Sequence, residues 1–383
     1  MTVLKRLSEE QVLLIKFWLP ALITGGVVWW LLLFLGQTPL LRASGLALVI
    51  VGVTLALRRM GSAIAIIGAL SLALSPAFWS QTGGSPGDPA TIVIAVAVAI
   101  LTVAMTVFVS KQPSLGFGLG IIVFALLFWS QIGTPRSIRL TGFIVGWLMY
   151  LMIDMLLVTN PRPEEAPMIL RDGGLKAVNG AIKARSYHIY GILLLIGLGI
   201  LNDPLLTLLL PAVTISLLLT KTRLEWWYWL LIGLVGGLGI RGLWLDYLVG
   251  QGHLLDLMSW QQGLNWVDMI ALLIEQFTIL GAGLSLLGLA RLARWYPPLG
   301  TVSMTGFAAY WLFGTIYTGN NETVLLLPMY IIFVLWMSYA ALALSEWAAK
   351  TLSGKTPFGR HFMIATYALL PLSMLWRIVN ELA

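Results

Sequence analysis

The sequence predicts an all-α polytopic membrane protein, and three observations support this. Hydrophobic residues make up 59% of the 383 residues and charged residues only 10%, whereas a soluble domain carries about 25% charged residues. Apolar runs of about 20 residues recur along the chain, and each can cross the hydrocarbon core of a bilayer as one helix. The basic residues gather in alternate loops. Because the apolar runs are continuous rather than alternating, helices are favoured over a closed barrel.

We predict about 13 transmembrane spans within one transmembrane domain that covers residues 1–383. The two short spans on either side of Asn202-Asp203-Pro204 have an alternative interpretation as a re-entrant hairpin. In chain order the predicted spans are 17–35, 40–57, 61–80, 91–110, 115–133, 140–159, 187–201, 205–220, 226–243, 266–290, 299–317, 323–345 and 361–380.

The basic residues predict the orientation of these spans. If the N-terminus lies in the cytoplasm, only five of the 23 Lys and Arg residues fall in outer loops, namely Arg42, Arg136, Arg139, Arg241 and Arg377. Positive charge is retained on the cytoplasmic side during insertion, so this split predicts an N-in, C-out protein of the bacterial inner membrane. Segment 160–186 is then a cytoplasmic loop. Segment 241–265 mixes aromatic residues with acids, as expected of an outer interfacial loop.

Composition excludes several classes of function. The chain has no cysteine, which rules out disulfides, thiol catalysis and thiolate metal sites. Its net charge of +7 is spread over many short loops, so we expect no nucleic-acid binding. The three histidines are widely separated, which disfavours a histidine metal cluster and leaves pigment or haem binding as a minor alternative.

Carboxylates on the predicted outer half are the candidate site residues. They are Asp88, Asp203, Asp246, Asp256, Asp268, Glu275 and Glu322. Mg²⁺ or Mn²⁺ binds such hard oxygen ligands and bridges to phosphate oxygens. The alternative is that these acids are ordinary polar ends of helices.

Glu275 differs from the other acids because it lies inside a predicted span, beside Gln276. A carboxylate at that depth costs about 2.5–3.5 kcal/mol on insertion scales and needs a partner or a water-filled cavity. We therefore expect Glu275 to be protonated, to pair with an arginine, or to line a polar cavity. Arg377, near the outer end of the last span, can reach the interface or contact a lipid phosphate.

Four segments resemble a bacterial branch of the GT-C-type membrane glycosyltransferases. They are Leu74-Ser75-Pro76-Ala77-Phe78-Trp79-Ser80-Gln81, Gly197–Asp203 leading into Leu208–Pro211, Glu275-Gln276-Phe277 leading into Leu284–Leu289, and Asn320-Asn321-Glu322 before Leu327–Tyr330. They cover residues 60–340 in the order that the family has.

The resemblance implies transfer of a sugar from a polyprenyl-phosphate lipid at the outer membrane face. It makes Asp88 and Glu322 the candidate catalytic residues, with Mg²⁺ or Mn²⁺ as the possible cofactor. Substrate and lipid-phosphate binding would fall to a second group of polar residues, which comprises Arg241, Arg377, Asp203, Glu275 and Gln276.

The chain departs from the family in its first outer loop. Enzymes of this type carry an acid there, whereas the loop here is only Gly36-Gln37-Thr38-Pro39. The His often found after the Asn of the Gly-rich span is also missing, because Asp203 follows Asn202. Without the carboxylate that would activate an acceptor, we expect little or no catalysis. A non-catalytic structural or assembly subunit of a larger membrane complex is the alternative.

Overall fold

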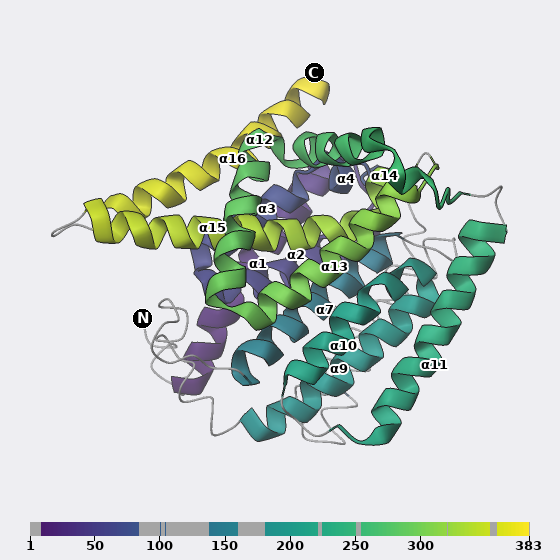
Figure 1. The fold of residues 1–383 in the computed structure, drawn as a ribbon. Coiled ribbons are helices and arrows are strands. Elements are labelled where there is room, and N and C mark those ends of the chain that lie inside the picture. The colour runs from purple at the N-terminus through teal and green to yellow at the C-terminus, as the bar shows by residue number, and fades with distance from the viewer. Residues whose placement is uncertain are drawn as a thin grey trace.

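The protein was studied as a computed structural model, which describes residues 9–83, 100, 104, 138–159, 181–220, 224–249, 254–319, 321–352 and 358–382. Over these residues the secondary structure is helical, without a β-strand and with one isolated bridge between Leu255 and Tyr317. The predicted all-α class is therefore confirmed for the described part of the chain (Figure 1).

The helices follow the apolar runs of the sequence. In chain order they are α1 (Glu9–Phe34), α2 (Leu40–Leu57), α3 (Ser62–Ala73), α4 (Pro76–Trp79), α7 (Ile138–Thr159), α9 (Ala181–Asn202), α10 (Leu210–Leu219), α11 (Trp226–Leu243), α12 (Gly263–Trp295), α13 (Pro297–Ile316), α14 (Glu322–Leu325), α15 (Leu327–Leu352) and α16 (Phe358–Leu382). Short helical turns add η2 (Arg58–Met60), η4 (Pro204–Leu209), η5 (Trp244–Val249) and η6 (Ser259–Gln261).

Seven helices among the described residues are long and apolar enough to cross a membrane, and they are α1, α2, α7, α11, α12, α15 and α16. The predicted spans 91–110 and 115–133 lie almost entirely outside the described residues. The total of 13 spans and the N-in, C-out orientation remain predictions.

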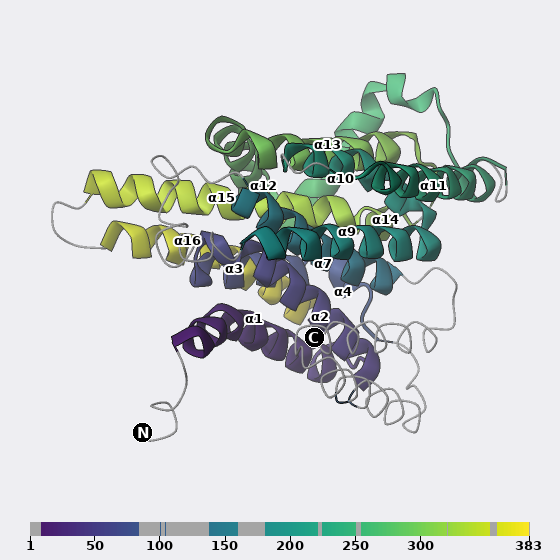
Figure 2. The same ribbon diagram turned by 90° about the horizontal axis from the view of Figure 1, so that it is seen from below.

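Helix α15 forms the centre of the bundle. In the most apolar stretch of α15, 94% of the residues are buried, compared with 11% in the corresponding stretch of α11. Helix α15 is therefore enclosed by protein, while α11 lies at the edge of the bundle. Figure 2 shows α1 on one side of the molecule and α10, α11 and α13 on the other, with α7 and α15 between them. A helix that is apolar all round is expected at such a central position. The large apolar side chains exposed on α1, α11, α12 and α16 are suited to contact with lipid tails.

One end of the bundle is basic. Arg59 in η2 contacts Asp154 near the end of α7, and Asp154 contacts His188 near the start of α9. The hydroxyl of Tyr296, between α12 and α13, donates to the carbonyl oxygen of Leu156 at 2.7 Å. The ends of α2, α7 and α12 that precede predicted inner loops therefore lie together, at an end of the bundle that we call the basic end.

Helix ends that border predicted outer loops lie together at the opposite end. Thr141 at the start of α7 donates to Asp203 after α9, at 3.1 Å. The segment before α12 is held on the end of α13, where the Asp256 amide donates to the Ile316 carbonyl at 2.8 Å and the Ser259 hydroxyl to the Thr315 carbonyl at 2.8 Å. We call this the acidic end, because it carries Asp203, Asp268, Glu275 and Glu322.

Candidate functional site

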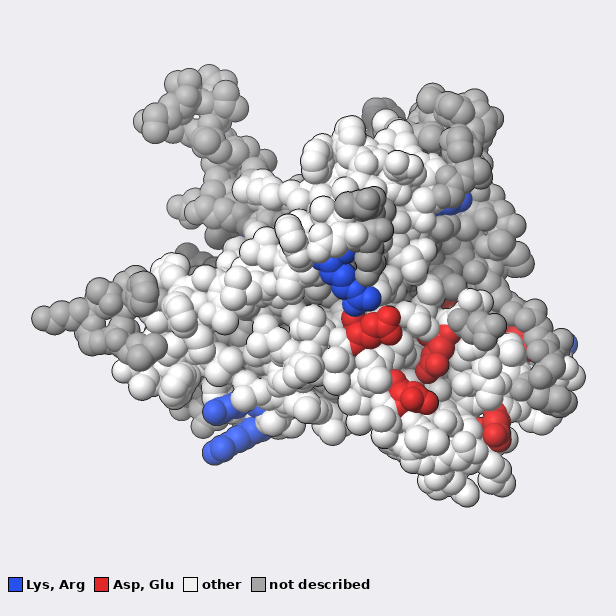
Figure 3. Space-filling model, turned by 90° about the horizontal axis from the view of Figure 1, so that it is seen from above, with Lys and Arg blue, Asp and Glu red and all other residues white. Residues whose placement is uncertain are grey.

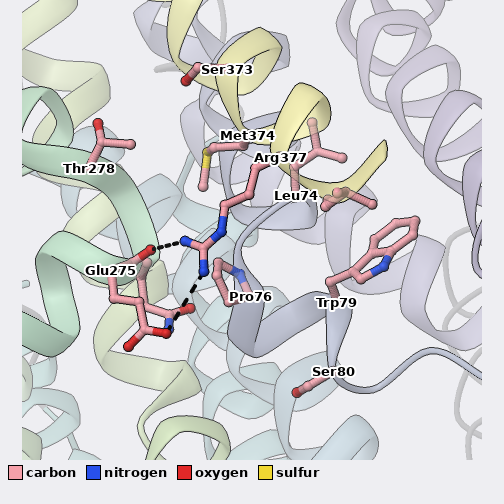
Figure 4. A pocket seen from close by; sticks show the side chains of 11 residues that line it. Leu74, Pro76, Trp79, Ser80, Glu275, Thr278, Ser373, Met374 and Arg377 are labelled. Carbon is pink, nitrogen blue, oxygen red and sulfur yellow. Dashed lines mark hydrogen bonds and ion pairs between the residues drawn. The ribbon is translucent and has the colours of Figure 1, made fainter. Parts of the chain in front are cut away.

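A hollow of about 290 Å³ opens at the acidic end between α4, α12 and α16. We call it the α4–α12–α16 hollow. Its walls combine apolar side chains with a few polar ones, which is typical of ligand sites. The lining residues are Leu74, Pro76, Trp79, Ser80, Glu275, Gln276, Thr278, Ser373, Met374, Arg377 and Ile378 (Figure 4).

Helix α12 is broken where it lines the hollow. Thr278 has φ 62° and ψ 170° between two helical stretches, and α12 changes direction part way along its length in Figure 1. This backbone region is essentially restricted to glycine, so a β-branched residue there stores about 1–3 kcal/mol of strain. Such strain gathers at ligand sites, because the surrounding structure has to hold it in place.

Replacing Thr278 with glycine is expected to stabilise the protein by about 1 kcal/mol. Glycine adopts the observed backbone conformation without strain, although its greater freedom in the unfolded chain offsets part of the gain. Thermal unfolding in mild detergent measures the effect. Thr305→Gly is the control, because Thr305 lies partly exposed within regular α13, where glycine should destabilise instead. Equal destabilisation by both variants would contradict a strained break at Thr278.

Arg377 and Glu275 form the charged part of the hollow. Arg377 Nη2 lies 4.0 Å from Glu275 Oε1, and Arg377 Nη1 donates to the Glu275 carbonyl oxygen at 3.3 Å. Figure 4 shows the guanidinium directed from α16 towards Glu275. Two of the three expectations for Glu275 are therefore met: it pairs with an arginine and it lines a polar hollow. The two side chains are 48% and 56% exposed, so their ion pair is weak.

Gln276 supplies a buried amide to the same hollow. The residue is 1% exposed, and its Oε1 accepts the backbone N–H of Ala77 at 2.7 Å. Its Nε2 is buried without a hydrogen-bond partner. An unsatisfied buried N–H costs about 1–3 kcal/mol, so a hydrogen-bond acceptor brought by a ligand would lower the free energy of the site.

Glu322 lies elsewhere at the acidic end. Burial, and to a smaller degree the nearby charge of Asp268, raise the pKa of the Glu322 carboxyl above its ordinary value. Figure 3 shows acidic side chains gathered on this face around a basic side chain. No group of three or more His, Asp or Glu residues suited to a metal ion occurs among the residues that the structure describes. No chemical step is therefore assigned to a metal ion.

Among the described residues, the other predicted site residues do not line the hollow. Asp203 is buried and caps η4, where its Oδ1 accepts the Leu205 amide at 2.9 Å. Arg241 is exposed in the last turn of α11. Asp88 lies outside the described residues. Of the seven predicted site residues, the structure thus brings Glu275, Gln276 and Arg377 together.

Sequence reasoning missed two features. The walls formed by Ser80, Ser373 and Met374 carry no signal of their own. At the basic end, Asp154 is a partly buried acid that is bound on both carboxylate oxygens. Arg59 Nε donates to Oδ1 at 2.8 Å, and His188 Nε2 lies 2.9 Å from Oδ2. An acid inside an apolar run was the available signal.

Fold and site together define a helical, multi-pass integral membrane protein with a polar hollow at one end of the bundle. Comparisons with known protein families, with curated proteins and with solved structures gave no significant match.

Proposed function

We propose that the protein is a GT-C-like integral membrane protein that binds a lipid-linked phosphate of the polyprenyl-phosphate class in the α4–α12–α16 hollow. One observation carries the proposal: a guanidinium group and a buried amide without a partner converge in a hollow with apolar walls. In the proposed orientation the hollow opens at the outer face of a bacterial inner membrane.

The donors of the hollow suit a phosphate group. Arg377 offers a permanent positive charge and several N–H donors in a planar array, which matches phosphate oxygens. The Nε2 of Gln276 offers a further N–H that the protein leaves unsatisfied. A phosphate would replace a weak, half-exposed ion pair with charge-assisted hydrogen bonds, which are stronger than neutral ones.

The apolar walls suit the hydrocarbon part of the same ligand. Leu74, Met374 and Ile378 line the hollow. On α16, Leu369, Leu372 and Trp376 are 58–70% exposed and would face lipid. A hydrocarbon chain could therefore leave the hollow along α16 without entering water, which separates a lipid phosphate from a soluble one.

We propose that the protein performs little or no sugar transfer. The connection between α1 and α2 is the short segment 35–39, which contains no acid and leaves no room for further helices. Transfer to an acceptor needs a base close to the reacting oxygen. Glu322, whose carboxyl has a raised pKa, does not line the hollow.

Ligand titration tests directly whether Arg377 binds the phosphate. Farnesyl phosphate, a short isoprenyl phosphate, is titrated into the purified protein in mild detergent, with farnesol as the uncharged comparison. Arg377→Gln is expected to weaken binding of farnesyl phosphate roughly tenfold or more, since a hydrogen bond to a charged group contributes about 1.5–3 kcal/mol. Arg241→Gln is the matched control, because Arg241 is exposed on α11 and does not line the hollow.

The outcomes of this titration are distinct. Loss of binding in Arg377→Gln alone supports the hollow as the phosphate site. Equal affinity of the wild type, Arg377→Gln and Arg241→Gln would show that the phosphate binds elsewhere. Equal binding of farnesol and farnesyl phosphate would show that only the hydrocarbon is recognised.

A non-catalytic subunit of a larger membrane complex is the second candidate function. The observation in its favour is the exposed apolar surface of α11. Only 11% of the residues in its most apolar stretch are buried, and Leu230 and Leu234 are more than half exposed. A partner helix would cover such a face as well as lipid does. Purification in mild detergent from the native membrane separates the two cases, since a subunit migrates with partners in fixed stoichiometry and a single protein migrates alone.

A further inference from the structure

We infer that Glu275 is a built-in competitor of the anionic ligand, occupying Arg377 when the hollow is empty and lowering its affinity for phosphate. This inference rests on the proposed function. It assigns to Glu275 the role of setting how tightly an anion is held, rather than a role in contacting the ligand.

The contact between the two residues has two separate parts. The carboxylate of Glu275 lies at the limit of an ion pair, 4.0 Å from Arg377 Nη2. The backbone carbonyl of Glu275 accepts a hydrogen bond from Nη1 at 3.3 Å. The backbone contact can hold the guanidinium in place while the carboxylate yields to an incoming anion.

The break in α12 explains why the backbone contact exists. A helix end leaves its last carbonyl groups without intrahelical partners, and Glu275 lies in the turn that precedes the non-helical Thr278. A cation at a helix C-terminus is also favoured by the helix dipole. The strained break therefore positions Arg377 through the main chain, independently of the charge on Glu275.

The exposure of Glu275 allows its carboxylate to leave Arg377 when an anion binds. Its side chain is 56% exposed, so it can turn into water without being buried unpaired. When the carboxylate stays near Arg377, it lowers the positive potential that an anion meets. Removing its charge while keeping its shape should therefore strengthen anion binding, whereas most substitutions at a ligand site weaken it.

The experiment compares Glu275→Gln with the wild type in the full-length protein, using inorganic phosphate and farnesyl phosphate as separate probes. Glu275→Gln is expected to bind both probes about two- to fivefold more tightly, the size expected of a half-exposed ion pair. The gain should shrink in high salt, because screening weakens exposed charges. If only farnesyl phosphate binds measurably, the ligand is a lipid phosphate; the effect of Glu275→Gln on that probe then decides the inference.

Two further variants control the result. Asp268→Asn removes a charge from an exposed site on the same half of α12 that does not line the hollow, and it should leave affinity within the error. The double variant Glu275→Gln/Arg377→Gln should show no gain over Arg377→Gln alone, because the competitor acts only through the arginine.

The failure of this inference differs from the failure of the proposed function. Wild-type binding that is unchanged or weakened by Glu275→Gln, while Arg377→Gln abolishes it, would overturn the competitor and leave the phosphate site intact. A gain of equal size in Asp268→Asn would show a general effect of negative charge and would also overturn it. Absence of binding in both the wild type and Glu275→Gln would overturn the site itself.

Discussion

Replacing Gly288 with alanine is expected to lower the free energy of unfolding by about 3 kcal/mol or more. Gly288 lies at a close approach between α12 and α15: a Cβ atom there would overlap the Trp336 carbonyl oxygen and lie 2.6 Å from its carbonyl carbon. These atoms belong to the main chain of α15, the most buried helix, and cannot rotate away. Overpacking costs about 1–3 kcal/mol and occasionally more, and a rigid main-chain neighbour places this site at the upper end of that range.

The matched control for Gly288→Ala lies in the same half of the same helix. A Cβ atom at Gly283 would meet no atom within 4 Å, so Gly283→Ala keeps only the better helix propensity of alanine, worth about 1 kcal/mol. Thermal unfolding in one detergent should therefore move in opposite directions for the two variants. Equal stability of the two would mean that α12 and α15 are further apart than the structure has them.

The existence of the helices could be predicted from the sequence, since run length and apolarity decide whether a segment can form a helix in lipid. Where helices divide was harder to predict. Residues 61–80 were predicted as one span, but α3 ends at Ala73 and α4 starts at Pro76. Ser75 caps α4 through a 3.4 Å bond from the Phe78 amide. Proline at the first helical position with serine before it is a helix-start signal. The start of α4 at Pro76 could therefore have been predicted from the sequence.

The break at Thr278 could not be predicted in the same way. No glycine or proline marks it, and the residues on both sides are good formers of an apolar helix. Only the tertiary contacts of α12 with α4, α15 and α16 hold Thr278 in a conformation that its own side chain disfavours. Local propensity therefore predicts an unbroken helix where packing imposes a break.

The candidate site was partly predictable for a similar reason. The free-energy cost of a carboxylate within a span predicted that Glu275 needs a partner, but not that the partner is Arg377, far away in the sequence. Asp203 shows the opposite case. It was predicted as a binding residue, whereas Asp followed by Pro204 also fits an N-cap with proline at the first position, which is how the structure uses it.

Replacing Asp154 with asparagine is expected to cost about 3–5 kcal/mol of stability, because it leaves the Arg59 guanidinium partly buried without a counter-ion. The side chains of Asp154, Arg59 and His188 are 14%, 22% and 10% exposed, so water can compensate only in part. Asparagine keeps the shape but replaces one acceptor oxygen with an NH2 donor, so one of the two contacts of Asp154 is lost together with the charge. Thermal unfolding at neutral pH measures the loss.

The double variant Arg59→Leu/Asp154→Leu shows whether the loss of stability in Asp154→Asn comes from the unpaired charge of Arg59 or from the loss of the Asp154 carboxylate itself. Replacing a whole buried ion pair with apolar residues is often neutral or stabilising, whereas removing one partner is not. The double variant should therefore be more stable than Asp154→Asn, although it changes two residues. If it is the less stable of the two, the hydrogen bond from His188 to Asp154 matters more than the ion pair. The packing of α2, α7 and α9 at the basic end would then depend on the hydrogen bonds of the Asp154 carboxylate rather than on neutralising the charge of Arg59.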